Sequence, residues 1–247
     1  SAHIMVFDSG IGGTTVLEHI KQSIPNAQYS YFMDNALLPY GAQSQQTIIN
    51  RLCSLIHFIK ANTLNVDLIV IACNTASTSA LSAVRQITDI PIVGVVPAIK
   101  PAAELTRSNH IGLLATPATV ASSYTKTLIA EHARNVIVNL YSSVELVTLA
   151  EECFFTGSLD TNKLYQVLDE LHIDKTIDVL VLGCTHFPIL AGPISQYFEG
   201  NVKLLDSGVA IANRVNFLLN QLNLCMDKQT DIKKPLQYYA TADVFSN

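Results

Sequence analysis

Two stretches of this sequence place a cysteine at the end of an aliphatic run. They are DLIVIACNTAS at 67–77 and DVLVLGCTHFP at 178–188. Each starts with an aspartate and continues as a run typical of a buried strand. Hydroxyl, amide or imidazole residues then follow the cysteine, which is Cys73 in the first stretch and Cys184 in the second. Two matching strand ends that each carry a thiol predict an active site with two sides.

Two thiols that face each other across a cleft can invert the configuration of a carbon. One thiolate takes a proton from one face of the carbon, and the other thiol delivers a proton to the opposite face. A thiol suits this chemistry because its ordinary pKa of about 8.5 is close to neutral pH and can be lowered by its neighbours. Asn74 and Thr75 follow one cysteine, and Thr185 and His186 follow the other. Both thiols are therefore expected in polar surroundings.

Other interpretations of the cysteines are open. Cys184 or Cys73 could attack a carbonyl with His186 as its base, but this pair leaves the matching second cysteine unexplained. A packing role, common for cysteine, is expected for Cys53 and Cys153, which lie among apolar residues. The five cysteines include no CxxC pair and are odd in number, so neither a zinc site nor a disulfide framework is expected.

Alternating strand and helix patterns surround these motifs. In the first half, strands are expected at 4–7, 29–33, 68–72 and 91–96, with helices to about 23, at 44–62, at 75–87 and near 98–106. The order then restarts, with strands opening 110–120, at 135–141, in VLVLGC and at 202–206, and with helices through about 132 and near 160–171. A helix at 209–222, a polar link at 225–234 and an edge strand in LQYYATAD are assigned to the first half.

Spacing supports an internal repeat of similar βα units. Cys73 lies 65 residues after Asp8, and Cys184 lies 68 residues after Thr116, a difference within ordinary loop variation. Alternation of helices with continuous aliphatic strands predicts parallel sheets covered on both faces. In such sheets ligands bind beyond the carboxyl ends of the strands, where Asp34 is expected as well.

The predicted fold is therefore α/β, with two pseudo-symmetric, doubly wound domains and the active site in the cleft between them. The first domain is expected to be discontinuous, comprising 1–96 and 208–247, and the second to comprise 97–207. Closure of the domains on a substrate is expected, with hinges at the crossings near Val96 and Asp206.

Composition excludes several classes of partner. The chain has 247 residues, a net charge of −5 and only 14% charged residues, and it has no Lys/Arg cluster to bind nucleic acid. No apolar run reaches the roughly 18 residues of a membrane span, and the start lacks a signal-peptide pattern. The protein is expected to be cytoplasmic, without membrane partners, and its apolar surface residues are compatible with a homodimer.

A Gly-rich turn follows the first expected strand. DSGIGG at 8–13 has neither the GxGxxG spacing nor the GK[ST] ending of a nucleotide-binding loop. A tight turn at a helix N-terminus explains the glycines better, and its free N–H groups can bind an anionic group such as a carboxylate.

Together, DSGIGG, DNALLPYG, ACNTAS and GCTHFPIL resemble the motif set of the bacterial glutamate racemase family, in the expected order from about residue 4 to 243. The resemblance implies two pseudo-symmetric α/β domains that interconvert L- and D-glutamate without pyridoxal phosphate or a metal. It also implies that the D-glutamate supplies peptidoglycan. Leu37 and Leu38 depart from the family, which often has an Arg or another polar residue there.

Residue by residue, Cys73 resembles the base that deprotonates D-glutamate, and Cys184 the base that deprotonates L-glutamate. Asp8 and His186 resemble groups that assist the thiols, and Glu151, chosen over Glu152, is a further candidate. The expected substrate shell, which holds two carboxylates and an ammonium, comprises Asp8, Ser9, Tyr40, Gly41, Asn74, Thr75, Thr116, Thr119, Thr185 and His186.

Simpler roles and other functions stay open. Asp8, Ser9, Thr116 and Thr119 could cap helices, Tyr40 and Gly41 could form only a turn, and His186 could be structural. A racemase of aspartate or a related acid would use the same two thiols. A non-catalytic binding protein for a small anion would keep the cleft but would have no use for both thiols.

Overall fold

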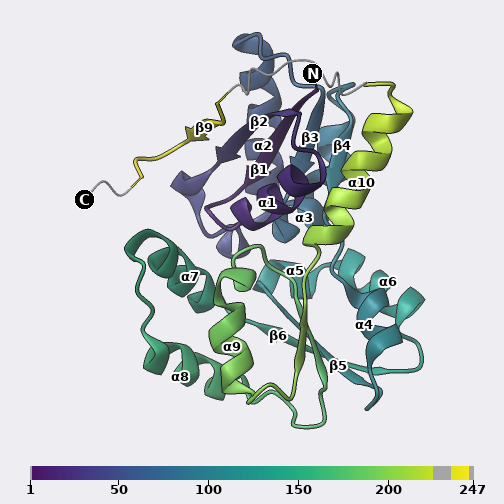
Figure 1. Cartoon of the computed structure of the whole chain (residues 1–247), viewed down its shortest axis with the longest axis vertical. Helices are drawn as coiled ribbons and strands as arrows, with labels where there is room; N and C mark the ends of the chain where they lie inside the picture. The colour runs from purple at the N-terminus through teal and green to yellow at the C-terminus, as the bar shows by residue number, and fades with distance from the viewer. Residues whose placement is uncertain (1, 225–234, 245–247) are drawn as a thin grey trace.

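The computed structural model describes residues 2–224 and 235–244, which form two α/β units around two parallel sheets (Figure 1). The expected polar link at 225–234 lies outside the described residues. The sheet of the first unit has the strand order β4 (Ile92–Gly94), β3 (Leu68–Ile71), β1 (His3–Asp8), β2 (Gln28–Met33) and β9 (Gln237–Ala240). The sheet of the second unit has the order β6 (Ile137–Ser142), β5 (His110–Ala115), β7 (Val179–Leu182) and β8 (Lys203–Leu205).

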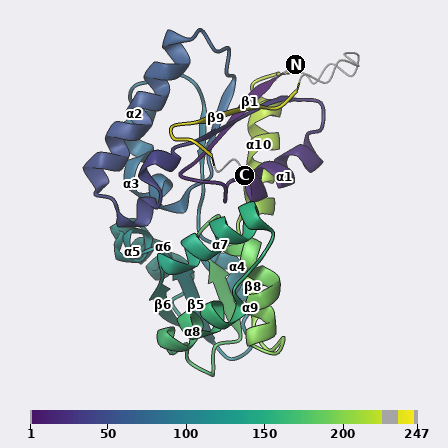
Figure 2. The ribbon, with the colours of Figure 1, turned by 90° about the vertical axis from the view of Figure 1, so that its left-hand side faces the viewer.

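Helices cover both faces of each sheet. Figure 2 shows α1 (Thr14–Ser23) and α10 (Gly208–Gln221) on one face of the first sheet, and α2 (Gln45–Ala61) and α3 (Asn74–Arg85) on the other. The second sheet packs α4 (Ile99–Leu105) and α6 (Ser123–His132) on one face. Its other face packs α7 (Glu145–Thr156), α8 (Thr161–Leu171) and α9 (Ala191–Tyr197). The α/β fold expected from the sequence is confirmed.

The alternation of β1 explains why both faces need helices. Ile4 and Val6 pack into the core that includes α1 and α10, whereas Met5 and Phe7 pack into the core that includes α2 and α3. Successive side chains of a strand point to opposite faces, and all four are at most 1% exposed. A strand that is apolar at every position is therefore buried on both sides.

The two sheets repeat one strand order, 4-3-1-2 in the first and the equivalent 8-7-5-6 in the second. Phe7 pairs with Ile71, and Leu114 pairs with Leu182, so each cysteine lies two residues beyond an equivalent strand position. The register corrects one detail of the sequence argument. Phe7 and Leu114 occupy equivalent positions in the two sheets, so the next residues, Asp8 and Ala115, are equivalent, and so are Ser9 and Thr116. Asp8 and Thr116, from which the two spacings were counted, are therefore offset by one residue.

The chain passes between the units at two places that lie side by side. It leaves the first sheet after β4 and returns to the first unit at α10, which packs against α1. The Ser207 hydroxyl donates to the Val96 carbonyl at 2.7 Å, so the two crossing segments are joined directly. Short segments completing the described structure are η1 (Asn35–Leu37), η2 (Tyr40–Ala42), α5 (Pro117–Ala121) and η3 (Phe187–Leu190).

Candidate active site

Cys73 and Cys184 line the same small cavity between the units. Each cysteine is two residues beyond the last residue of a central strand, β3 or β7, and the carboxyl ends of both strands point toward the junction. The cavity measures about 10 Å³, which is room for about one water molecule. It is lined by Ser9, Pro39, Tyr40, Gly41, Cys73, Asn74, Thr75, Thr116, Val147, Cys184, Thr185 and His186.

Most of the residues expected to bind substrate line this cavity, but two do not. Asp8 lies behind the wall, and Thr119 contacts the lining hydroxyls of Thr75 and Thr116 at 3.3 and 3.4 Å. Pro39 and Val147 also line the cavity, and neither was expected from the sequence. Val147 is one helical turn before Glu151 on α7, so helical spacing from that carboxylate could have indicated it.

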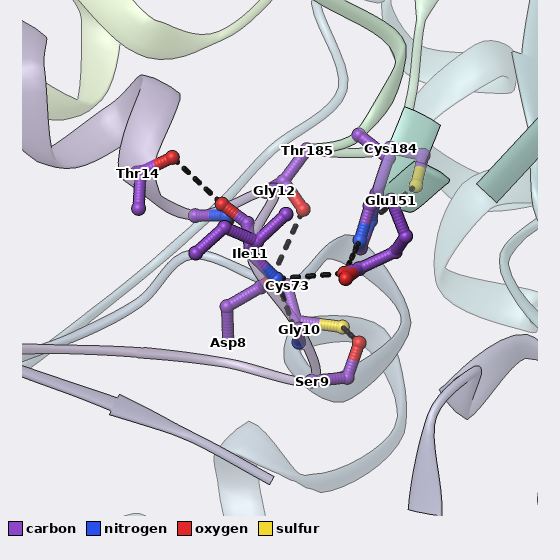
Figure 3. A network of polar contacts seen from close by, with 12 residues as sticks. Asp8, Ser9, Gly10, Ile11, Gly12, Thr14, Cys73, Glu151, Cys184 and Thr185 are labelled. Atoms are coloured by element: carbon purple, nitrogen blue, oxygen red, sulfur yellow. Dashed lines mark hydrogen bonds and ion pairs between the residues drawn. The ribbon is translucent and has the colours of Figure 1, made fainter. Parts of the chain in front are cut away.

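Asp8 organises the Gly-rich turn from a completely buried position. One carboxylate oxygen accepts the N–H groups of Gly10 and Gly13 at 3.1 and 3.2 Å, and the other accepts the Thr185 hydroxyl at 3.0 Å (Figure 3). Burial raises the pKa of Asp8, an effect opposed by the charge of His186 and by these hydrogen bonds. Asp8 therefore joins the turn of the first unit to the second cysteine motif.

A chain of polar contacts runs from Cys184 to the Gly-rich turn. His186 Nδ1 lies 3.8 Å from Cys184 Sγ, and its Nε2 lies 2.6 Å from Glu151 Oε1. The same Glu151 oxygen accepts the N–H of Ile11 at 2.8 Å. Of the two candidate glutamates, Glu151 is the one that contacts His186, whereas the neighbouring Glu152 is exposed.

His186 is held as an imidazolium at neutral pH. Burial lowers its pKa, but the hydrogen bonds to Cys184 and Glu151 and the charges of Cys184 and Asp8 outweigh burial and raise the pKa to about 10. A protonated ring can donate from both nitrogens, to the carboxylate on one side and to the sulfur on the other. This arrangement places a cation next to Cys184 Sγ.

Cys73 has different surroundings. Its Sγ caps α3 by accepting the N–H of Ala76 at 3.4 Å, and its thiol donates to Ser9 Oγ at 4.0 Å. Burial, followed by the negative charge of Asp8, raises the pKa of Cys73, so this residue is a thiol at neutral pH. Cys73 is therefore placed to give a proton, whereas Cys184 has the His186 imidazolium beside it.

Hydroxyl groups from both units meet at the cavity. The Thr75 and Thr116 hydroxyls lie 2.6 Å apart, and Thr119 completes the cluster. Among the described residues, the buried Asn74 Oδ1 has no hydrogen-bond partner. A buried acceptor without a partner is costly, and a ligand that carries an N–H group could satisfy it.

The raised pKa of His186 predicts that stability falls as pH rises from about 6.5 to about 10. In this window the folded protein holds a proton that the unfolded chain has lost, so the free energy of unfolding decreases by up to about 1.4 kcal/mol per pH unit. Urea unfolding at pH 7 and pH 9 measures this decrease. His186→Asn should show a shallower decline, since other titrating groups are common to both proteins, and equal declines would contradict the prediction.

Two further properties concern the described residues only. Within 2–224 and 235–244, no three His, Cys, Asp or Glu side chains are grouped to hold a metal ion. Over the same ranges, no helix combines the length and apolar character needed to cross a membrane.

Comparison with known proteins identifies the family. The model of the Asp/Glu/hydantoin racemase family matches residues 12–215. A glutamate racemase of Shewanella frigidimarina is 48% identical over 99% of this chain and 91% of its own length.

Solved structures agree with this match. Escherichia coli glutamate racemase, crystallised with L-glutamate and the activator UDP-MurNAc-ala, has a TM-score of 0.88 and 38% identity over 98% of this chain and 90% of its own. A Francisella tularensis glutamate racemase in complex with D-glutamate has a TM-score of 0.79 and 32% identity over 98% and 89%. The chain therefore belongs to the Asp/Glu/hydantoin racemase family.

Proposed function

We propose that this chain is a glutamate racemase, an isomerase that interconverts L- and D-glutamate with two cysteines as its acid and base. The observation that carries the proposal is the pair of thiols on equivalent strand ends of two units, lining one cavity. The relatives described above, which carry the name glutamate racemase, support glutamate as the substrate. The chemistry needs no cofactor, because each thiol group supplies or accepts one proton.

The proposed reaction transfers one proton at each face of the Cα carbon. From L-glutamate, the Cys184 thiolate takes the Cα proton, and the Cys73 thiol gives its proton to the opposite face. The reverse direction starts from D-glutamate with Cys73 as the base. His186, assisted by Glu151, stabilises the charge at Cys184, and Asp8 positions the turn and Thr185.

Neutral donors are proposed to hold the substrate. The hydroxyls of Ser9, Thr75, Thr116 and Thr185, together with backbone N–H groups near Gly41, suit the two carboxylates, and Thr119 supports the Thr75 and Thr116 hydroxyls. Asn74 suits the ammonium group, because its buried Oδ1 can accept an N–H. Tyr40 forms part of the enclosing wall.

Because the cavity is small, we propose that the units separate for substrate entry. Glutamate is far larger than the roughly one water molecule for which the cavity has room. We place the hinge at the adjoining crossings near Val96 and Asp206, and the domains at 1–96 plus 208–247 and at 97–207. The hydrogen bond between Ser207 and Val96 supports this position, because it joins the only two crossings in the described chain.

Exchange of the Cα hydrogen with solvent tests the function. Pyridoxal-free, metal-stripped protein is expected to take L-glutamate in deuterated water to zero optical rotation, with deuterium at Cα in the racemised product. Aspartate in place of glutamate tests the alternative substrate. Absence of exchange with both acids, in protein whose cysteines are verified as reduced, would favour the binding-protein interpretation.

We also propose a cellular role for the enzyme. D-Glutamate is a building block of peptidoglycan, so we place the enzyme in cell-wall synthesis in the cytoplasm. A homodimer is also proposed, on the basis of exposed apolar side chains such as Ile137, Val209 and Phe217. Light scattering of the purified chain measures its mass in solution.

A further inference from the structure

Asp34 is the buried centre of a polar network directly behind the cavity wall. It follows β2, its side chain is 2% exposed, and four side-chain donor groups converge on it. Arg51 of α2 donates from Nε to one carboxylate oxygen at 2.7 Å and from an Nη to the other at 2.5 Å. The Tyr40 hydroxyl donates at 2.5 Å and the Thr241 hydroxyl at 2.7 Å.

These contacts keep Asp34 ionised in spite of burial. Burial alone raises the pKa of a carboxyl group, but the hydrogen bonds from Arg51, Tyr40 and Thr241 outweigh it and lower the pKa of Asp34. A bidentate guanidinium also fixes the carboxylate in one orientation. Asp34 is therefore a rigid, charged acceptor for the hydroxyl of Tyr40.

Tyr40 and Gly41 are the part of the first unit that this network places against the cavity. Tyr40 is 1% exposed, its ring lies 6.2 Å from that of Phe7, and it lines the cavity beside Cys73. Gly41 lies so close to the second unit that a Cβ there would be 2.5 Å from the Cβ of Thr116. A small shift of this wall would change both the cover over Cys73 and the fit between the units.

Thr241 connects a segment that is distant in sequence to the Asp34 carboxylate. It directly follows β9, which pairs with β2 at the edge of the first sheet. Tyr239 anchors the strand by packing its ring against Phe32 and Phe58. Thr241 reaches Asp34 from this position, 207 residues away in sequence.

We propose that Asp34 is a positioning residue for racemisation, which holds the Tyr40 and Gly41 wall in the shape that binds the substrate. Thr241 extends this support to the C-terminal strand. The inference rests on the proposed function, and it assigns a role in the site to residues that do not touch the cavity.

Kinetics of matched variants test the proposal. Asp34→Asn should raise KM by roughly ten- to a hundredfold with a smaller effect on kcat, because a displaced wall weakens binding without removing a thiol. Thr241→Val removes the hydroxyl that donates to Asp34 and accepts the Ala36 N–H, directly after an edge strand, and should raise KM roughly threefold. Thr241→Ser keeps the hydroxyl and should restore the wild-type KM. Asp169→Asn removes the same charge from an exposed carboxylate that accepts the Tyr197 hydroxyl and does not line the cavity, and should leave KM unchanged.

Alkylation of Cys73 provides a readout that does not depend on glutamate. Iodoacetamide labelling, followed by peptide mass spectrometry, should be several-fold faster at Cys73 in Asp34→Asn and Thr241→Val than in wild type or Asp169→Asn, because the wall over this 6% exposed residue is loosened. Thermal unfolding identifies any variant that is not folded, and Thr241→Val then carries the test.

The outcomes separate this inference from the proposed function. Unchanged KM and unchanged Cys73 labelling in both folded variants would overturn the positioning role while wild type still racemises glutamate. A wild-type protein that does not racemise glutamate overturns the proposed function instead, and the labelling rates then decide whether the network holds the wall.

Discussion

Cys73→Ala and Cys184→Ala are each expected to lower the rate of glutamate racemisation by about a thousandfold or more. Each variant lacks the acid or base at one face of Cα, and general acid and base catalysis contributes about 10² to 10⁴ in rate per positioned group. Inversion needs both faces, so neither thiol can replace the other. Measurement of optical rotation with time, at substrate concentrations that give kcat and KM separately, checks the expectation.

The remaining thiol should still act on its own face. Cys73→Ala keeps Cys184 beside the His186 imidazolium, so it is expected to exchange the Cα hydrogen of L-glutamate with deuterium slowly and without inversion. Cys184→Ala should exchange D-glutamate without inversion but more slowly still, because the raised pKa of Cys73 keeps it a thiol at neutral pH. NMR of each enantiomer in deuterated water distinguishes this pattern from a simple loss of binding, which would remove both exchange reactions.

The chain offers two matched controls for these variants. Cys53 and Cys153 are half-buried on α2 and α7 and do not line the cavity, so Cys53→Ala and Cys153→Ala should racemise glutamate like wild type. Equal loss of activity in all four variants would indicate destabilisation. Full activity in Cys73→Ala or Cys184→Ala would contradict the two-thiol mechanism.

Local sequence patterns were sufficient for the sheets and for the two thiols. Uninterrupted aliphatic runs such as 68–71 need burial on both faces, which predicts a central parallel strand. A cysteine two residues after such a run lies at the carboxyl edge of its sheet. Two copies of that pattern, with similar spacing from the start of each repeat, therefore implied two similar units without any structural information.

Contacts between distant segments could not be predicted in the same way. Glu151 and Ile11 are 140 residues apart, and Asp34 and Thr241 are 207 apart. Such pairs depend on how the units dock and where the last strand pairs, which periodicity within one element does not encode. Arg51 illustrates the difficulty, since it lies on an amphipathic helix where a solvent-exposed arginine is the ordinary expectation.

Which of Glu151 and Glu152 contacts His186 also depends on how the chain folds. Removing the charge of that glutamate is expected to have the second large effect on activity. Glu151→Gln should lower kcat/KM by roughly tenfold to a hundredfold, because a neutral amide no longer stabilises the His186 imidazolium. The loss of this negative charge lowers the pKa of His186, so the alkaline limb of the pH–rate profile should move to lower pH.

Glu152, which is adjacent to Glu151 on α7, provides a direct control. Glu152→Gln removes the same charge from an exposed position of the same helix, so it should leave both kcat/KM and the alkaline limb unchanged. Since L- and D-glutamate are equal in free energy, kcat/KM must fall by the same factor in both directions, although kcat and KM can change differently. A loss confined to Glu152→Gln would assign the assisting role to the other glutamate, whereas a loss without a pH shift would mean that Glu151 acts through its hydrogen bond to Ile11.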